Sequence, residues 1–325
     1  MANGNPIESH PVMGRHAQKL RALGYEDVEG VTGALIGAAR EMSAYLSEDM
    51  TAALPNAAPG FAAAPVFQLG VVLDAIPAPL FAFAMAASPA IALPPSVNLI
   101  PNMPPVRDQA NRGTCVAHAA LSALENLRTS QASFRDMSEQ FLYWDCKQHD
   151  GIPNQPGTWL GVAVPRLQVG GCCTEGIWGY NPNPTANEDQ GPPTAGALPE
   201  APTYRITRYQ ALAPTSVIDI KAELVRGRCV AFSVPVFDSW LRNTAVAASG
   251  NIVLPFPDEA VVGGHAMCIC GYRDNPAEAE IGGGRFILRN SWDSLWGTAS
   301  TYGVGYGTIP YAYIARFGKE AYSIE

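Results

Sequence analysis

The sequence contains few charged residues and no long run of basic ones. Aspartate, glutamate, lysine and arginine make up 15% of the 325 residues, against about a quarter in an average soluble protein, so a disordered polyelectrolyte is excluded. There are 21 basic and 29 acidic residues, a formal net charge of −8, and no basic cluster is longer than two residues. We therefore expect no nucleic acid partner.

Cysteine is scarce, and a typical signal peptide is missing. Seven cysteines are too few for a disulfide scaffold in a chain of this length, and the odd number leaves at least one thiol free. The N-terminal stretch lacks the basic start and apolar run of a secretory signal, so we expect a cytoplasmic protein or one exported by a signal-peptide-independent route. Residues 71–92 are apolar, but they contain Asp74 and several prolines, so no stable membrane span is expected.

The composition divides the chain into three parts. Apolar residues at spacings of three and four predict two or three helices, which assigns residues 1–54 to a small helical bundle. Residues 55–92 are rich in alanine and proline and contain one charged residue, so this segment must cover a surface, either of this chain or of a partner. Residues 93–325 have the mixed composition of a folded domain.

Within the main domain, helical patterns come first and strand patterns follow. Residues 115–130 carry one apolar stripe and predict a buried helix. A proline-rich stretch without periodicity predicts a long loop over residues 181–203. Strand-like runs then lie at residues 229–236, 264–272, 285–292 and 302–314. The second half of this domain is therefore predicted to be mainly antiparallel β.

Cys115 is the candidate nucleophile because it opens the predicted buried helix. The free N–H groups and the dipole at a helix N-terminus stabilise a thiolate, which predicts a pKa below the usual value of about 8.5. The alternative is that Cys115 is one more small buried residue, as most free cysteines are.

A thiolate nucleophile needs an imidazole, and His265 is the best candidate among five histidines. It follows two glycines, which let a backbone or substrate come close, and it starts an apolar strand. Its alternative role is a strand-edge histidine bonded to a carbonyl. His118 lies one turn after Cys115 and is expected to be a packed core residue, while His10 and His149 are expected at the surface.

Two polar side chains can complete this chemistry. Asn290 can orient the imidazole through its amide oxygen, and the neighbouring Trp292 can shield that hydrogen bond from water. Gln109, six residues before Cys115, can donate to an oxyanion together with the Cys115 backbone N–H. A turn asparagine beside core tryptophans is the alternative interpretation of Asn290.

With these residues in view, the sequence resembles the papain-like cysteine peptidases, in a bacterial-type branch. The family pattern is Gln, five residues, the nucleophilic Cys at the head of the central helix, a distant His at the start of a β-run, and Asn-Ser-Trp. Here these positions are Gln109, Cys115, His265 and residues 290–292, and the Ser-Glu-Gln segment at 138–140 also matches.

The resemblance implies an α+β fold of two halves: a helical half whose central helix starts at Cys115, and an antiparallel β-barrel-like half, with the active site in the cleft between them. It implies peptide hydrolysis by Cys115, His265, Asn290 and Gln109, on a protein or peptide substrate. Gly157, Gly264 and Trp292 are predicted to bind that substrate. No cofactor or metal is expected; on a strand, Cys268 and Cys270 would face away from His265.

The family also often has a helical inhibitory prosegment, so residues 1–92 are predicted to keep the enzyme a zymogen, with residues 55–92 in or beside the cleft. The alternative is a targeting or partner-binding module, for example of a leaderless secreted effector. Arg112 stands where the family commonly has a cysteine, so one family disulfide is missing.

Two other functions use the same fold. The chain could be a catalytically silent binding protein on a peptidase scaffold. It could also be an acyltransferase, deamidase or isopeptidase effector, because those reactions share the triad and differ in substrate geometry.

Overall fold

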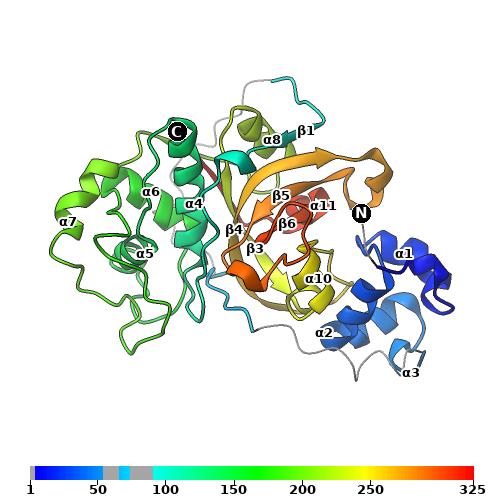
Figure 1. The fold of residues 1–325 in the computed structure, drawn as a ribbon. Helices are drawn as coiled ribbons and strands as arrows, with labels where there is room; N and C mark the ends of the chain where they lie inside the picture. Colours follow the sequence, from blue (N-terminus) through cyan, green and yellow to red (C-terminus); the bar gives the residue numbers. More distant parts are fainter. Residues whose placement is uncertain (1–3, 54–65, 74–90) are drawn as a thin grey trace.

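The structure is a computed structural model that describes residues 4–53, 66–73 and 91–325. A helical half and a sheet half lie side by side, and a group of N-terminal helices packs on the far side of the sheet half (Figure 1). The α+β fold with a helical N-terminal region is as predicted. Most of the predicted Ala/Pro-rich segment, residues 55–92, lies outside the described residues.

The helical half is built around one long buried helix. Its helices are α4 (Cys115–Ser130), α5 (Glu139–Lys147), α6 (Leu160–Val169) and α7 (Ala197–Glu200). The first twelve residues of α4 are all buried, because α4 packs against α5 and α6 on one side and against strands of the sheet half on the other. The predicted helix over 115–130 is confirmed. The predicted loop at 181–203 contains α7 near its end, followed by a 3₁₀ turn at Ala201–Tyr204.

The sheet half is an antiparallel sheet of seven strands in the order β2-β7-β3-β4-β5-β6, with β1 paired to β4. The strands are β1 (Ser96–Asn98), β2 (Tyr209–Ala211), β3 (Val230–Phe237), β4 (Val261–Asp274), β5 (Gly284–Arg289), β6 (Tyr306–Pro310) and β7 (Glu320–Ile324). β3 and β5 are buried along their whole length. This sheet supplies the long strand β4, on which His265 lies.

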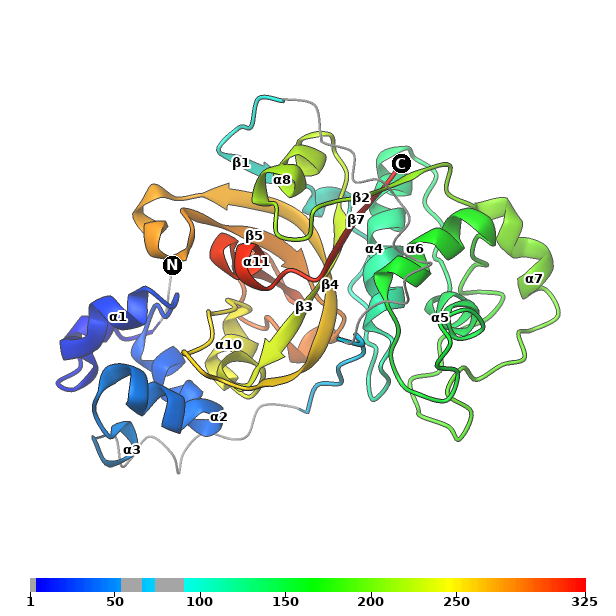
Figure 2. The ribbon, with the colours of Figure 1, turned by 180° about the vertical axis from the view of Figure 1, so that it is seen from behind.

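Helices cover the sheet half, and one of them corrects a predicted strand. They are α8 (Val217–Val225), α9 (Asp238–Leu241), α10 (Thr244–Ser249) and α11 (Tyr311–Phe317), with α8 and α11 best seen from behind (Figure 2). The predicted strand at 302–314 ends at Pro310. The alternation Tyr-Ala-Tyr-Ile after Pro310 resembles a strand, but the consecutive residues Tyr313 and Ile314 are both buried together with Tyr311, as on one face of a helix and unlike the alternating faces of a strand.

The N-terminal helices share the core of the sheet half. They are α1 (Ala17–Arg21), α2 (Val28–Leu46) and α3 (Met50–Ala53). Leu20, Val31 and Met42 belong to the same buried cluster as Trp240. Buried polar contacts fix the docking: the Asn243 amide donates to the Gly30 carbonyl (2.8 Å).

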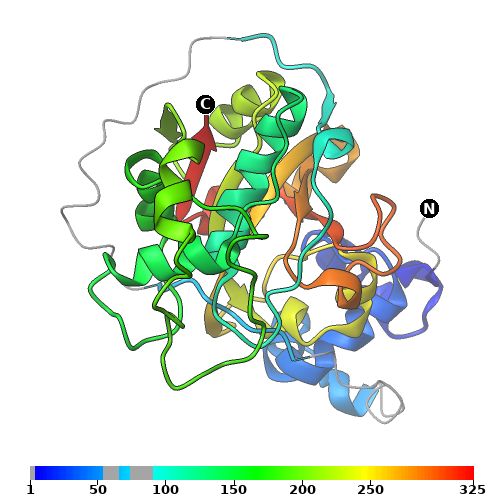
Figure 3. The same ribbon diagram turned by 60° about the vertical axis from the view of Figure 1, so that its left-hand side comes forward.

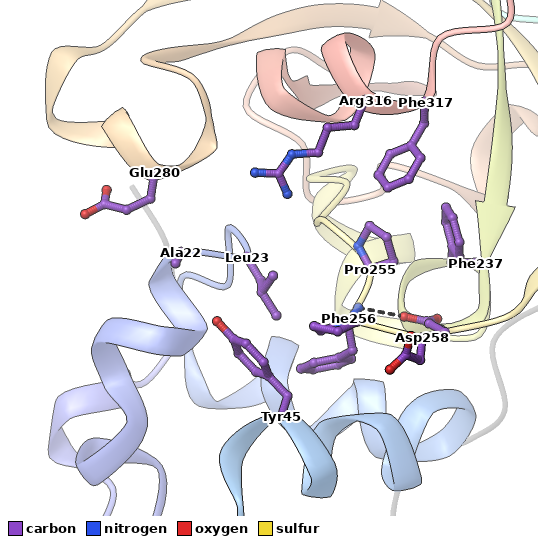
Figure 4. A pocket seen from close by; sticks show the side chains of 12 residues that line it. Ala22, Leu23, Tyr45, Phe237, Pro255, Phe256, Asp258, Glu280, Arg316 and Phe317 are labelled. Atoms are coloured by element: carbon purple, nitrogen blue, oxygen red, sulfur yellow. Dashed lines mark hydrogen bonds between the residues drawn. The ribbon is translucent and has the colours of Figure 1, made fainter.

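A cavity of about 560 Å³ remains where α1 and α2 meet the sheet half. Tyr45 of α2 and Leu23, just after α1, lie beside Phe256 on one side of this cavity, and Arg316 and Phe317 of α11 lie on another side (Figure 4). The rings of Tyr45 and Phe256 lie 6.1 Å apart.

In the described part of the chain, no helix is long and apolar enough to cross a membrane.

Residues 66–73, which we call the strap, run between the helical half and the sheet half (Figures 1 and 3). Val71 pairs with Thr158, just before α6, and with Gly264 of β4. The strap thus occupies the groove between the two halves, where the sequence predicted the cleft.

Candidate active site

Cys115 is the first residue of α4, and its sulfur is completely buried. The backbone N–H of Ala266, on β4, donates to the Cys115 Sγ (3.4 Å). The head of the central helix therefore touches the strand that carries His265, the residue just before Ala266. The structure brings these two predicted residues together although 150 positions separate them in the sequence.

Burial disfavours the thiolate form of Cys115 in this structure. Burial raises the pKa of the Cys115 thiol to about 12, although the backbone N–H groups of Ala266, Gly70 and Val116 act in the opposite direction. The prediction of a lowered pKa is wrong for this state of the protein. The physical reason is that the strap and the core exclude water from the sulfur, and the loss of hydration outweighs the helix N-terminus.

His265 is buried on β4 and held by two neighbours. One ring nitrogen, Nε2, lies 2.8 Å from the Asn290 Oδ1, and the ring stacks on Trp292 at 4.3 Å between centroids. The other nitrogen, Nδ1, is buried with no hydrogen-bond partner among the described residues. Burial lowers the pKa of His265 to about 4, although the hydrogen bond with Asn290 acts in the opposite direction.

Asn290 follows β5 and is fixed by its surroundings. Besides contacting His265, its Oδ1 accepts a hydrogen bond from the Ser291 N–H (2.8 Å). Trp292 is almost fully buried over this pair, as the sequence predicted. The Asn-Ser-Trp motif thus positions one face and one nitrogen of the imidazole.

Gln109 is buried, and its amide group points toward the strap. Its Nε2 donates to the Gln68 carbonyl (3.0 Å) and to the Arg112 carbonyl (2.9 Å). Its Oε1 accepts from the Ser291 hydroxyl (2.6 Å). The donor that the sequence assigns to an oxyanion therefore faces a carbonyl oxygen of the strap, and Ser291 is a supporting residue that sequence reasoning missed.

Backbone hydrogen bonds hold the strap on both sides of the groove. On the sheet side, the N–H groups of Gly70 and Val71 donate to the Gly264 carbonyl at 3.2 and 3.0 Å. On the helical side, the Thr158 N–H donates to the Gly70 carbonyl (3.1 Å) and the Val72 N–H to the Thr158 carbonyl (3.3 Å). Gly264 therefore contacts backbone of the chain itself, and its role in substrate binding stays a prediction.

Side chains and close approaches also hold the strap. Phe67 stacks on Trp292 with 4.1 Å between ring centroids, so Trp292 lies between Phe67 and His265. A Cβ added to Gly70 would lie 2.1 Å from the Gly113 carbonyl oxygen, and one added to Gly157 would lie 2.7 Å from the Gly70 carbonyl oxygen. The strap passes the residues before Cys115 at a distance that only glycine permits.

The histidines and cysteines outside the candidate site lie in the core or at the surface of the protein. His118 is buried in α4 with its Nδ1 3.0 Å from the Thr114 carbonyl, so it is the predicted core histidine. His149 is exposed, and His10 is half-buried. All seven cysteines lie in described parts of the chain, and all are free and buried.

Comparison with known proteins identifies the family. Residues 94–311 match the model of the papain family of cysteine proteases. The chain belongs to the papain family. A peptidase C1-like protein of Acanthamoeba polyphaga mimivirus is 27% identical to this papain-family chain over 218 residues, which are 64% of this chain and 65%, less than two thirds, of that protein.

Solved structures agree on the fold. The cysteine protease xylellain from Xylella fastidiosa is similar with a TM-score of 0.66 and 27% identity, over 79% of this chain and 95% of the other. Digestive procathepsin L 3 of Tenebrio molitor larval midgut, at 15% identity, shares the fold with a TM-score of 0.57 over 95% of this chain and 98% of the other. The predictions of a papain-like fold and of membership in the papain family of cysteine proteases are confirmed.

Proposed function

We propose that this papain-family peptidase hydrolyses peptide bonds with Cys115 as nucleophile, His265 as acid and base, Asn290 as the residue that orients His265, and Gln109 as an oxyanion donor. The observation that carries the proposal is the geometry around Cys115: its sulfur contacts the amide that follows His265, while His265 is hydrogen-bonded to Asn290. Both reacting groups are thus beside the same groove.

The proposed reaction has two steps. His265 Nδ1 takes the proton of the Cys115 thiol, and the sulfur forms a bond to the carbonyl carbon of a peptide lying in the groove. The negative charge on the carbonyl oxygen accepts hydrogen bonds from Gln109 Nε2 and the Cys115 N–H. The C–N bond then breaks as His265 returns the proton to the leaving amine. Water, activated by His265, attacks the thioester and releases the acid and the free thiol.

We also propose that the strap keeps the peptidase latent. It occupies the backbone contacts at Gly264 and Thr158 and the donor of Gln109, which a substrate would need. Its Phe67 covers Trp292. The strap therefore blocks substrate binding, and burial of the sulfur in the closed state, which raises the pKa of Cys115, disfavours the thiolate.

Substitution of the nucleophile tests the hydrolytic function. In an enzyme opened by Gly70→Ala, whose added Cβ collides with the Gly113 backbone, Cys115→Ala should abolish hydrolysis of an unstructured peptide library, by a factor of about 10³ or more, since nothing else in the site can form the thioester. Cys268→Ala, at a buried cysteine on the same strand as His265, is the matched control and should retain activity. Equal activity of both variants, or no activity in any open form of the enzyme, would contradict the proposal.

A further inference from the structure

Lys147, the last residue of α5, is a buried cation. Its side chain is 0% exposed, and its ammonium group lies 2.8 Å from the Asp150 carboxylate. The ammonium also donates to the carbonyls of Gln155 (2.7 Å) and Gly157 (2.9 Å). A lysine has three N–H donors; two of them go to these carbonyls, and the neighbouring Asp150 carboxylate balances the charge. Burying a charge is costly unless it is paired in this way, so the arrangement points to a specific role.

Tyr143, one turn earlier on α5, binds the backbone N–H of Gly157, whose carbonyl is bound by Lys147. The Tyr143 hydroxyl accepts the Gly157 N–H (2.9 Å) and donates to the Glu188 carboxylate (2.6 Å). Both polar backbone groups of Gly157 therefore bond to side chains of α5. The loop 150–157 contains no helix or strand, and no cysteine of the described residues ties it down.

The residue that follows Gly157 makes the helical side of the groove. Thr158 pairs with the strap through its N–H to the Gly70 carbonyl and its carbonyl to the Val72 N–H. A displacement of Gly157 would move these two groups directly. The other side of the groove is the Gly264 carbonyl on β4. None of the hydrogen bonds named here connects it to α5.

We propose that Lys147 is a positioning residue for peptide binding: with Tyr143 it fixes Gly157, and so sets the Thr158 backbone at the place where it pairs with a peptide in the groove. The proposal rests on the proposed function in so far as it extends from the strap to a substrate. The hydrogen bonds and the ion pair of Lys147 involve neither Cys115 nor His265. Lys147 should therefore influence peptide binding and leave the chemistry of the Cys115 sulfur unchanged.

Amide hydrogen exchange in the full chain tests the proposal without any catalytic turnover. The test variant is Lys147→Met combined with Asp150→Asn, which avoids an unpaired buried carboxylate. We expect about 3- to 30-fold faster exchange at the amides of Thr158 and Val72, corresponding to one or two lost hydrogen bonds. The amides of Gly70 and Val71, which donate to Gly264, should change less than about threefold.

Two further variants keep the test decisive. Tyr143→Phe removes one hydroxyl with little change of shape and should accelerate the same two amides, which secures the test if the Lys147 variant does not fold. Lys221→Met with Asp274→Asn is the matched control, since Lys221 is also buried and ion-paired (2.7 Å) but lies in the sheet half. It should leave all four strap-related amides unchanged. Unchanged exchange at Thr158 and Val72, or equal acceleration at all four amides, would overturn the proposal.

Kinetics separate this proposal from the proposed function. In an enzyme opened by Gly70→Ala, the Lys147 variant should raise KM for a peptide about tenfold and change kcat less than about twofold, because it weakens backbone binding alone. Alkylation of Cys115 by iodoacetamide should stay the same. A fall in kcat at constant KM would overturn the positioning role, whereas absence of hydrolysis in the parent enzyme would contradict only the proposed function.

Discussion

Gly70→Ala should open the groove. At Gly70 the strap packs directly against the backbone of Gly113, two residues before Cys115: an alanine Cβ there would lie 2.1 Å from the Gly113 carbonyl oxygen and 2.3 Å from its carbon. Both are backbone atoms, so no side chain can move aside. The strap must move out of the groove. It then loses at least the two hydrogen bonds that Gly70 makes with Gly264 and Thr158.

The size of the effect follows from these bonds. Each contributes about 0.5–1.5 kcal/mol net, so the closed state loses about 1–3 kcal/mol relative to the open one. At about 1.4 kcal/mol per factor of ten, the open population rises about 5- to 150-fold. Since Cys115 is completely buried when the strap is seated, its alkylation rate and the rate of peptide hydrolysis should rise by the same factor.

The assay is the rate of iodoacetamide labelling of Cys115, followed by peptide mass spectrometry. Gly176→Ala is the matched control, because a Cβ there meets nothing within 4 Å and the residue has no positive φ. It should label at the rate of the unchanged chain. If Gly70→Ala labels no faster than Gly176→Ala while both stay folded, the strap does not protect the sulfur, and the account of latency fails.

Two more predictions concern the same closed state. Phe67→Ala removes the stacking contact with Trp292, worth about 0.5–1.5 kcal/mol beyond the buried area, and should raise labelling of Cys115 about 2- to 12-fold; an unchanged rate would show that the ring does not anchor the strap. In the full chain, burial places the pKa of Cys115 at about 12, so the thiolate forms only as pH rises toward that value. A plot of labelling rate against pH should therefore keep rising above pH 10, and a plateau near pH 8 would contradict the buried neutral thiol.

Some parts of this molecule can be predicted from local sequence, and others depend on distant contacts. The helix Cys115–Ser130 is predictable because its apolar stripe is regular. The residues Gln109, Cys115, His265 and Asn290 can be recognised from their types, order and spacing, and the structure brings them to one place.

The strap illustrates what local sequence does not contain. It is held mainly through backbone groups of Gly70, Val71 and Val72 that pair with residues far away in the chain, and a backbone contact leaves no pattern of side chains. The raised pKa of Cys115 could not be predicted for a similar reason. It depends on burial of the sulfur by the strap and the core, which are distant in the sequence. Lys147 looks like an ordinary charged residue at a helix end, and only the folding of loop 150–157 over it makes it a buried cation.

The most direct test of the central claim is the effect of His265 on the reactivity of Cys115 once the groove is open. In Gly70→Ala, we expect labelling of Cys115 to be fast at pH 6–7, because a neighbouring imidazole can take the thiol proton below the usual thiol pKa of about 8.5. Adding His265→Ala should slow labelling at that pH at least about tenfold and shift the pH dependence to higher values. If Cys115 labels equally fast at pH 6–7 with and without His265, the two side chains do not act as a pair, and the proposed mechanism is wrong.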